Sequence, residues 1–273
     1  MNKCYPLSKS EEGIYISSLS SSDAYNLANI VNLEKNVNVK QVNDALNKVL
    51  QAHPYLFTIL SNDDEGNVVK HIEVEDIVLT LHEVDQLDIK SLPYELIDKH
   101  LYRFGLYKVK EEYYFYFDFH HLLMDGTSIK IFIDDFFLAL EGKQLEVEQY
   151  NANDYALEEK EELKSKAYEE GKSYYEKLVG DIEIDSTPTE DKLDKDISYD
   201  NIRIPLKIKN KQIKALSNKN HVKTSTIFLA GFAYLLSKYN MENAALFLTV
   251  NNSRNEKARH SFGSYVKTYP LYI

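Results

Sequence analysis

Apolar residues recur at helical spacing early in the chain. Within residues 39–50 they stand at positions 42, 45, 46, 49 and 50, on one face of a helix. Pro54 follows shortly afterwards and ends the pattern, because proline has no backbone N–H to continue a helix. Ser8 and Glu11 have the spacing of a capping box, so they predict a short helix that begins directly after Ser8.

The strongest strand signal lies in the middle of the chain, where residues 103–109 and 113–121 predict two strands joined by a short turn. The second strand, Tyr-Tyr-Phe-Tyr-Phe-Asp-Phe-His-His, is apolar or aromatic on both faces, which favours a buried position inside a sheet. Weaker patterns predict strands at residues 25–33, 55–60, 68–72, 77–84, 202–208 and 244–250, an extended end at 265–273, and helices at 92–101, 154–178, 210–218 and 225–239.

These strands and helices interleave without a regular strand–helix–strand rhythm. The pattern predicts an α/β (α+β two-layer) fold of two lobes, each a sheet with helices packed on it. An acidic stretch interrupted by Pro188 separates them and has the composition of a linker. We therefore expect an N-terminal lobe at residues 1–180, a linker at 181–197 and a C-terminal lobe at 198–273.

Composition and charge narrow the possible partners. Of the 273 residues, 44% are hydrophobic and 27% charged, which is ordinary for a globular protein with a sizeable core. The formal net charge is -11 and no cluster of Lys and Arg stands out, so neither nucleic acid nor an acidic membrane surface is an expected partner. The single cysteine, Cys4, cannot form an internal disulfide, and no signal peptide or membrane span is evident, so a cytoplasmic location is expected.

The candidate chemistry lies in His120-His121-Leu122-Leu123-Met124-Asp125-Gly126. Two histidines end the buried strand, an Asp-Gly turn follows, and Thr127 or Ser128 is expected to cap a helix at residues 129–140. Taken singly, these residues are more often structural: Asp125 could only cap the helix, and Gly126 could only serve a positive φ. Their combination in one strand–turn–helix segment favours an imidazole fixed beside a carboxylate and free backbone amides.

This segment resembles the His-His-x-x-x-Asp-Gly motif of non-ribosomal peptide synthetase condensation domains, a motif shared by chloramphenicol acetyltransferase-like enzymes. Three other segments resemble motifs of that family: Pro6-Leu7-Ser8-Lys9-Ser10-Glu11-Glu12-Gly13-Ile14-Tyr15, His53-Pro54-Tyr55-Leu56-Phe57-Thr58 and Gly263-Ser264-Tyr265-Val266-Lys267-Thr268-Tyr269-Pro270. Asp154-Tyr155-Ala156 lies on a helix in the expected place. The resemblance extends over essentially the whole chain and implies a chloramphenicol acetyltransferase-like fold.

The resemblance implies an acyltransferase that forms an amide bond between two substrates carried as thioesters on phosphopantetheine arms. His121 would accept the amine proton or position the amine, and the Gly126 backbone N–H would face the oxyanion. His120 and Asp125 would build the turn of the catalytic motif. The expected partners are carrier protein domains and an adenylation domain of a parent synthetase in antibiotic biosynthesis. No directly bound cofactor is implied, and the scattered histidines lack the spacing of a metal site, so none is expected.

The chain departs from the family pattern at three positions, since Glu11 replaces the usual Gln, Phe57 the usual Arg and Lys267 the usual Asn. It also ends at Ile273, before the family's usual end, so we expect a fragment with a complete N-terminal lobe and a partial C-terminal lobe. Other readings stay open: an epimerisation domain, a stand-alone O- or N-acyltransferase, or a non-catalytic recruitment module. The intact His121 disfavours the last, and cyclisation domains carry Asp in place of the two histidines.

Arg254 is the expected partner of Asp125. The resemblance implies that the motif aspartate is tied to an arginine from the other lobe, and Phe57 removes one nearby candidate. A carboxylate beside a buried strand needs a partner, and a planar guanidinium would satisfy both of its oxygens. We therefore predict a structural ion pair between Asp125 and Arg254, with His121 in a cleft between the lobes.

Overall fold

A computed structural model describes residues 3–20, 24–33, 37–180, 182–183, 186–188 and 203–273. These residues form two compact units, each of which is described by itself. Unit 1 comprises Met1–Glu169 and Asn252–Lys267, and unit 2 comprises Glu170–Asn251 and Thr268–Ile273. Unit 1 is therefore built from two stretches of chain that are far apart in sequence.

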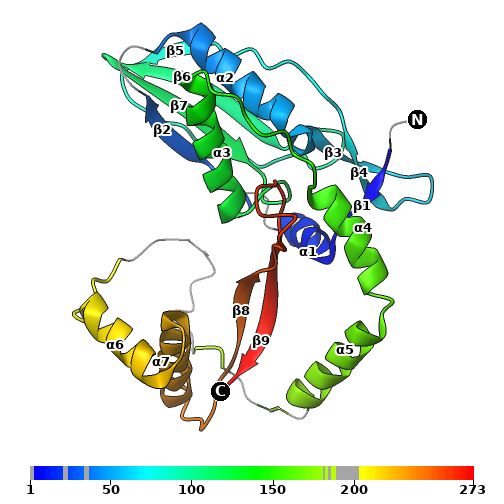
Figure 1. Cartoon of the computed structure of the whole chain (residues 1–273), viewed down its shortest axis with the longest axis vertical. Coiled ribbons are helices and arrows are strands. Elements are labelled where there is room, and N and C mark those ends of the chain that lie inside the picture. Colours follow the sequence, from blue (N-terminus) through cyan, green and yellow to red (C-terminus); the bar gives the residue numbers. More distant parts are fainter. Residues whose placement is uncertain (1–2, 21–23, 34–36, 181, 184–185, 189–202) are drawn as a thin grey trace. The chain divides into compact units, whose positions relative to one another are not determined.

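A four-stranded sheet with the order β2-β7-β6-β5 forms the centre of unit 1 (Figure 1). The strand β7 pairs antiparallel with β2 and β6, and β5 pairs parallel with β6. The interior position of β7 confirms the prediction from its two apolar faces. The four strands are β2 (Asn29–Leu33), β5 (Leu81–Val84), β6 (Tyr102–Val109) and β7 (Glu112–Phe119).

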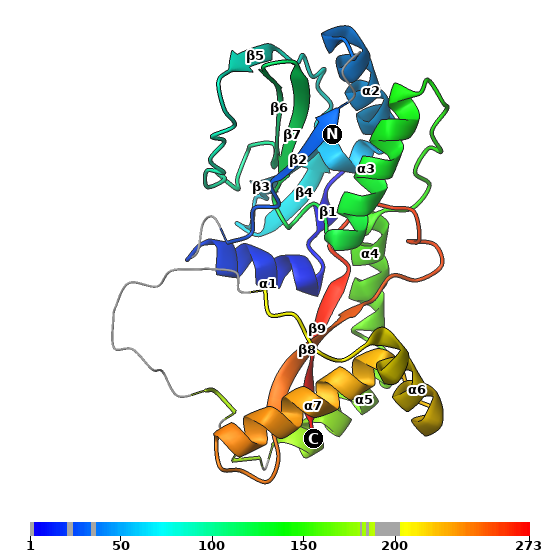
Figure 2. The same cartoon turned by 90° about the vertical axis from the view of Figure 1, so that its left-hand side faces the viewer.

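Two helices, α2 (Val39–Ala52) and α3 (Gly126–Leu140), lie side by side on one face of this sheet (Figure 2). The apolar face predicted within α2 is buried, from Val42 to Leu50. Aromatic rings fill the space beneath α3, where Phe115 of β7 stacks on Phe136 with ring centroids 4.4 Å apart. This core fixes the end of β7 and the start of α3, the two elements that flank the His-His-x-x-x-Asp-Gly segment.

A smaller sheet with the order β1-β4-β3 completes unit 1. Its strands are β1 (Tyr5–Pro6), β3 (Thr58–Asn62) and β4 (Val68–Ile72). The helix α1 (Lys9–Ser18) begins after Ser8, and the predicted capping box with Glu11 is present. The predicted strand at residues 55–60 begins instead as a 3-10 turn, η1 (Pro54–Phe57), because Pro54 occupies its first position.

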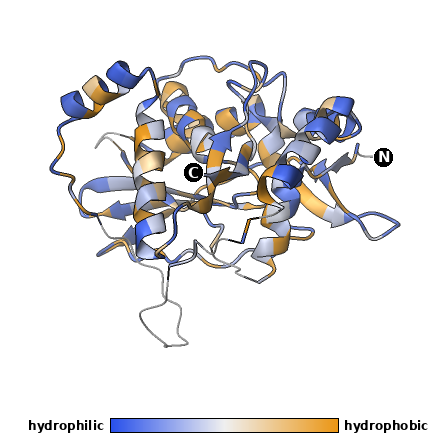
Figure 3. Ribbon diagram, turned by 90° about the horizontal axis from the view of Figure 1, so that it is seen from below, coloured by the Kyte–Doolittle hydropathy of each residue, from blue (hydrophilic) through white to orange (hydrophobic). Residues whose placement is uncertain are grey.

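The described part of unit 2 carries two helices of its own, α6 (Asn210–Asn220) and α7 (Thr224–Tyr239), which pack against each other. Strands β8 (Leu246–Asn252) and β9 (Val266–Tyr272) pair with each other. In Figure 3 the helices carry both hydrophobic and hydrophilic segments. Several large apolar side chains of α6 and α7 are exposed: Leu216, Phe228, Phe232 and Leu235.

Three further predicted elements need correction. Residues 92–101 are not helical, because the chain there hydrogen-bonds to neighbouring strands: Asp98 N–H donates to the Leu60 carbonyl at 2.7 Å. The helix predicted at residues 154–178 is two helices, α4 (Ala152–Glu162) and α5 (Lys166–Val179), since the Ser165 hydroxyl caps a new first turn. Residues 203–208, the described part of the strand predicted at 202–208, form no strand.

The predicted linker at residues 181–197 lies mostly outside the described residues, so the division into lobes at 1–180 and 198–273 remains a prediction. The position of His121 in a cleft between lobes also remains a prediction. Among the described helices, none combines the length and the apolar character that a membrane span requires.

Candidate active site

The backbone of the motif is held on both sides at the end of β7. His120 N–H donates to the Leu101 carbonyl at 2.9 Å, and His121 N–H donates to the Tyr25 carbonyl at 2.8 Å. Successive residues of an extended chain point to opposite sides. The two adjacent histidines therefore have different surroundings, although their sequence positions alone do not distinguish their roles.

His120 is a fixed, neutral side chain. It is fully buried, and its Nδ1 accepts a hydrogen bond from Leu122 N–H at 3.2 Å. Its Nε2 lies 3.3 Å from the Ser18 hydroxyl, which itself donates to the Ile14 carbonyl, so Nε2 carries the proton. Burial, with smaller contributions from His121 and Arg103, lowers the pKa of His120 to about 4. These contacts support a structural role in the turn.

His121 has a different environment. Its side chain is half-buried, and its ring lies edge-on to Tyr25 with centroids 6.4 Å apart. His121 Nδ1 is buried and has no hydrogen-bond partner among the described residues, whereas both ring nitrogens of His120 have partners. Nε2 is therefore the nitrogen of His121 that could face a substrate.

Asp125 is the N-cap of α3, which corrects the expectation that Thr127 or Ser128 caps this helix. Its carboxylate is almost completely buried, and Oδ1 accepts from Ser128 N–H at 2.9 Å. The structure brings Arg254 to the same oxygen, with Nη2 2.8 Å from Oδ1. Oδ2 accepts from Tyr265 N–H at 3.2 Å, so the expectation that Arg254 would satisfy both oxygens was wrong.

Arg254 is anchored by more than the carboxylate. Nη1 donates to the carbonyls of Ala258 at 2.9 Å and Ser261 at 2.6 Å, and the guanidinium lies over the Tyr265 ring, 4.4 Å from its centroid. The Arg254 side chain is 6% exposed. Asp125 and Arg254 belong to the same compact unit, because the 252–267 segment of the predicted C-terminal lobe is part of unit 1.

Gly126 is the first residue of α3, and neither its backbone conformation nor its surroundings require glycine there. Its φ is not positive, and a Cβ built on it would meet no atom of the described residues within 4 Å. The described part of the chain therefore leaves the space beside the first turn of α3 open. A helix N-terminus presents N–H groups and a partial positive charge, so this space suits a developing negative charge on a substrate oxygen.

The three departures from the family pattern each have a local explanation. Glu11 forms a buried ion pair with Lys70 at 2.7 Å and accepts from the Tyr55 hydroxyl at 3.1 Å, contacts that its capping spacing did not reveal. Burial, opposed by the charge of Glu11, lowers the pKa of Lys70. Phe57 packs edge-on to Tyr102, and Lys267 pairs with Glu159 at 2.7 Å.

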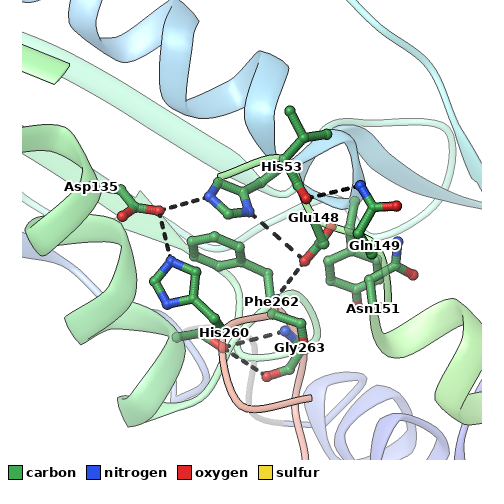
Figure 4. Close-up of polar contacts among 12 residues, drawn as sticks. His53, Asp135, Glu148, Gln149, Asn151, His260, Phe262 and Gly263 are labelled. Atoms are coloured by element: carbon green, nitrogen blue, oxygen red, sulfur yellow. Dashed lines mark hydrogen bonds and ion pairs between the residues drawn. The ribbon is translucent and has the colours of Figure 1, made fainter. Parts of the chain in front are cut away.

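The sequence also missed a cluster around His53, which Figure 4 shows. His53 Nε2 lies 2.7 Å from Oδ2 of Asp135, and His260 Nε2 lies 3.5 Å from the same oxygen. Glu148 Oε1 is 4.0 Å from the other ring nitrogen of His53, and burial raises the pKa of Glu148 to about 8. These side chains converge from four distant segments, so no local spacing could have revealed them, and the expectation of scattered histidines needs this correction.

Comparisons with known proteins extend this picture. The family model described as Condensation domain matches residues 1–273. Bacitracin synthase 1 of Bacillus licheniformis is 28% identical over 281 residues, which cover 98% of this chain and 5% of that protein. The chain thus spans about one twentieth of the length of this curated relative.

Solved structures share the fold. The first condensation domain of the calcium-dependent antibiotic synthetase, in complex with a substrate analogue, has a TM-score of 0.76 and 16% identity, covering 99% of this chain and 69% of that one. The epimerization domain from the third module of tyrocidine synthetase B has a TM-score of 0.79 and 15% identity, covering 100% and 68%. Both likenesses confirm the predicted fold class.

Proposed function

Because this chain belongs to the condensation-domain family, we propose that it forms an amide bond between an acyl or peptidyl thioester and the amine of an aminoacyl thioester. Both substrates would be carried on phosphopantetheine arms of carrier protein domains, with an adenylation domain in the same parent synthetase. A cytoplasmic location, where such carriers are loaded, belongs to the same proposal.

The observation that carries this proposal is the contrast between His120 and His121. His120 has hydrogen bonds at both ring nitrogens, whereas the half-buried His121 has a buried, unpartnered Nδ1 among the described residues and keeps Nε2 for a substrate. An imidazole held at a strand end by its own backbone, with hydrogen-bonding capacity to spare, suits proton transfer or amine positioning.

In the proposed reaction the amine nitrogen attacks the thioester carbon, and the carbonyl oxygen takes up the negative charge. His121 accepts a proton from the nitrogen. The oxyanion then reforms the carbonyl as the carbon–sulfur bond breaks, and the thiolate leaves and is protonated. A thiolate is a good leaving group because the pKa of a thiol is only about 8.5. The N–H groups at the start of α3, beside Gly126, would stabilise the oxyanion.

Asp125 and Arg254 are positioning residues in this scheme. Their ion pair fixes the turn between His121 and α3, and neither side chain needs to touch the substrate. A substitution at this pair is therefore expected to lower stability and activity together. Loss of the His121 imidazole is expected to lower activity alone.

The experiment is His121→Ala in the protein that carries this chain, assayed with two loaded carriers. We expect product formation to fall about 10²–10⁴-fold, the usual contribution of an acid–base residue. His82→Ala, at an exposed histidine of β5, is the matched control and should keep the parent rate. Equal rates for the parent and His121→Ala would refute the role of His121. Inversion of a carrier-bound aminoacyl group without amide formation would instead identify an epimerase.

A further inference from the structure

Three potential metal ligands cluster outside the proposed active site. The Nε2 atoms of His53, at the end of α2, and His260, in the 252–267 segment, both face the Oδ2 atom of Asp135 on α3 (Figure 4). These three atoms all lie within 4.8 Å of one another. We propose that His53, Asp135 and His260 bind one divalent transition-metal ion, with zinc as the best fit.

The donor set favours zinc over harder cations. Two imidazole nitrogens and one carboxylate oxygen suit Zn²⁺ and related first-row ions, whereas Mg²⁺ and Ca²⁺ prefer all-oxygen sites. Bond lengths of about 2.1 Å place the ligand atoms of a tetrahedral site about 3.4 Å apart. The 3.5 Å between His260 and Asp135 already matches this spacing. The 2.7 Å between His53 and Asp135 would open by about 0.7 Å.

Glu148 is positioned to make the outer contact that such a site would use. A metal-bound histidine usually donates its second N–H to a carboxyl oxygen, which fixes the tautomer. Glu148 Oε1 lies 4.0 Å from His53 Nδ1 and is itself held by Phe262 N–H at 2.8 Å. The Oε1 atom of Glu148 can accept a hydrogen bond from the His53 ring whether or not the Glu148 carboxyl group is ionised. His53 Nδ1 is buried and has no hydrogen-bond partner among the described residues, so a small shift toward Glu148 would satisfy it.

The charge of Asp135 is a second, independent argument. Its side chain is 4% exposed, and in the described part of the chain its ion-pair partners are the two histidines alone. A buried carboxylate without a permanent cation is costly. A bound divalent ion would compensate this charge, and the 46% exposed side chain of His260 leaves an entry path and room for a water ligand.

The proposed ion would act on the segment that carries Arg254. His260 and Arg254 both lie within Asn252–Lys267, whereas His53 and Asp135 lie on α2 and α3. A metal bond to His260 would therefore fix this segment on the two helices. The expected consequence is a structural zinc site that strengthens the Asp125–Arg254 contact.

The test is titration of the full chain with ZnCl₂, followed by calorimetry and by thermal unfolding, with MgCl₂ as the comparison ion. We expect one zinc per chain and a higher unfolding temperature with zinc but not with magnesium. His260→Ala removes a half-exposed ligand without opening the core, so this variant should fold. It should bind zinc at least about 10–100-fold more weakly, the loss that even an outer-shell substitution causes.

His82→Ala is the matched control, since it removes an exposed histidine from β5 and should leave zinc affinity unchanged. Co²⁺ provides an independent readout, because visible bands of a tetrahedral cobalt centre should appear in the parent chain and be lost in His260→Ala. Zinc binding that is absent, or equal in the parent and His260→Ala, would show that the cluster is only a hydrogen-bonded network. Neither result tests the role of His121, so the proposed zinc site can be refuted without refuting the proposed function, and the reverse is also true.

Discussion

Replacement of Arg254 by methionine tests the contact that fixes the turn of the catalytic motif. Methionine keeps an apolar stem of similar length and removes the guanidinium. Asp125, which is 1% exposed in the parent, would keep Ser128 N–H and Tyr265 N–H as donors but would lose its cation. The variant therefore leaves a buried charge without its partner.

The expected cost follows from these contacts. Loss of one partner of a buried ion pair typically costs about 3–5 kcal/mol. The carbonyls of Ala258 and Ser261 also lose their donor from Arg254, which favours the upper part of this range. Asp125→Asn is the gentler variant, because asparagine is an equally good N-cap; it removes the charge and replaces the oxygen that accepts from Tyr265 N–H by an NH2 group. We expect it to cost about 2 kcal/mol, the scale of a hydrogen bond to a charged group.

The assay is urea unfolding combined with amide hydrogen exchange of the β7–α3 segment, because the two units need not unfold together. The double variant Asp125→Asn/Arg254→Met should be more stable than the sum of the single losses predicts, by about 0.5–3 kcal/mol. An Arg254→Met variant within about 0.5 kcal/mol of the parent, or strictly additive losses, would refute the reasoning.

Two further substitutions test buried charges elsewhere in unit 1. Lys70→Met should lower the free energy of unfolding by about 3–5 kcal/mol, because it leaves Glu11 buried without its cation. In urea unfolding, the double variant Glu11→Gln/Lys70→Met should recover most of that loss. A double variant as unstable as Lys70→Met would contradict this. The pKa of His120 is about 6.5 in the unfolded chain but about 4 in the folded one, so protonation favours the unfolded chain. The contribution of His120 to the free energy of unfolding is therefore complete above about pH 6.5. It should fall by about 3 kcal/mol as the pH drops to about 4. His120→Asn should lack this part of the pH dependence, and identical pH profiles for the parent and the variant would disprove it.

Periodicity predicted elements well where burial on one face determines structure. The strand at 68–72 and the buried face of α2 have the expected residues, because regular alternation and helical spacing report directly on which side faces the core. The helix expected at 92–101 failed for a different reason. Asp98 N–H donates to the Leu60 carbonyl, and the Tyr94 hydroxyl donates to the buried Asp118 carbonyl. These tertiary contacts outweigh local helical preference.

In the candidate site, too, the sequence predicted some features and missed those that depend on tertiary contacts. The resemblance supplied the His-His-x-x-x-Asp-Gly motif and the choice of Arg254, whose guanidinium the structure places at Asp125. The different environments of His120 and His121 depend on contacts with Ser18 and Tyr25, about a hundred residues away, so the sequence could not separate them by geometry. The convergence of His53, Asp135 and His260 arises only when α2, α3 and the 252–267 segment pack together.

Unit 1 is built from two stretches of chain, residues 1–169 and 252–267, which leave the ribosome at different times. Asp125 precedes Arg254 by 129 residues, and a ribosome adds about 5–20 residues per second, so roughly 6–26 s pass before the carboxylate meets its cation. Phe262 and Tyr265, which are fully buried in the same unit, emerge later still. All of unit 2 up to Asn251 is therefore translated while the core of unit 1 is open, which makes this interval the period in which a nascent chain would most need chaperone protection.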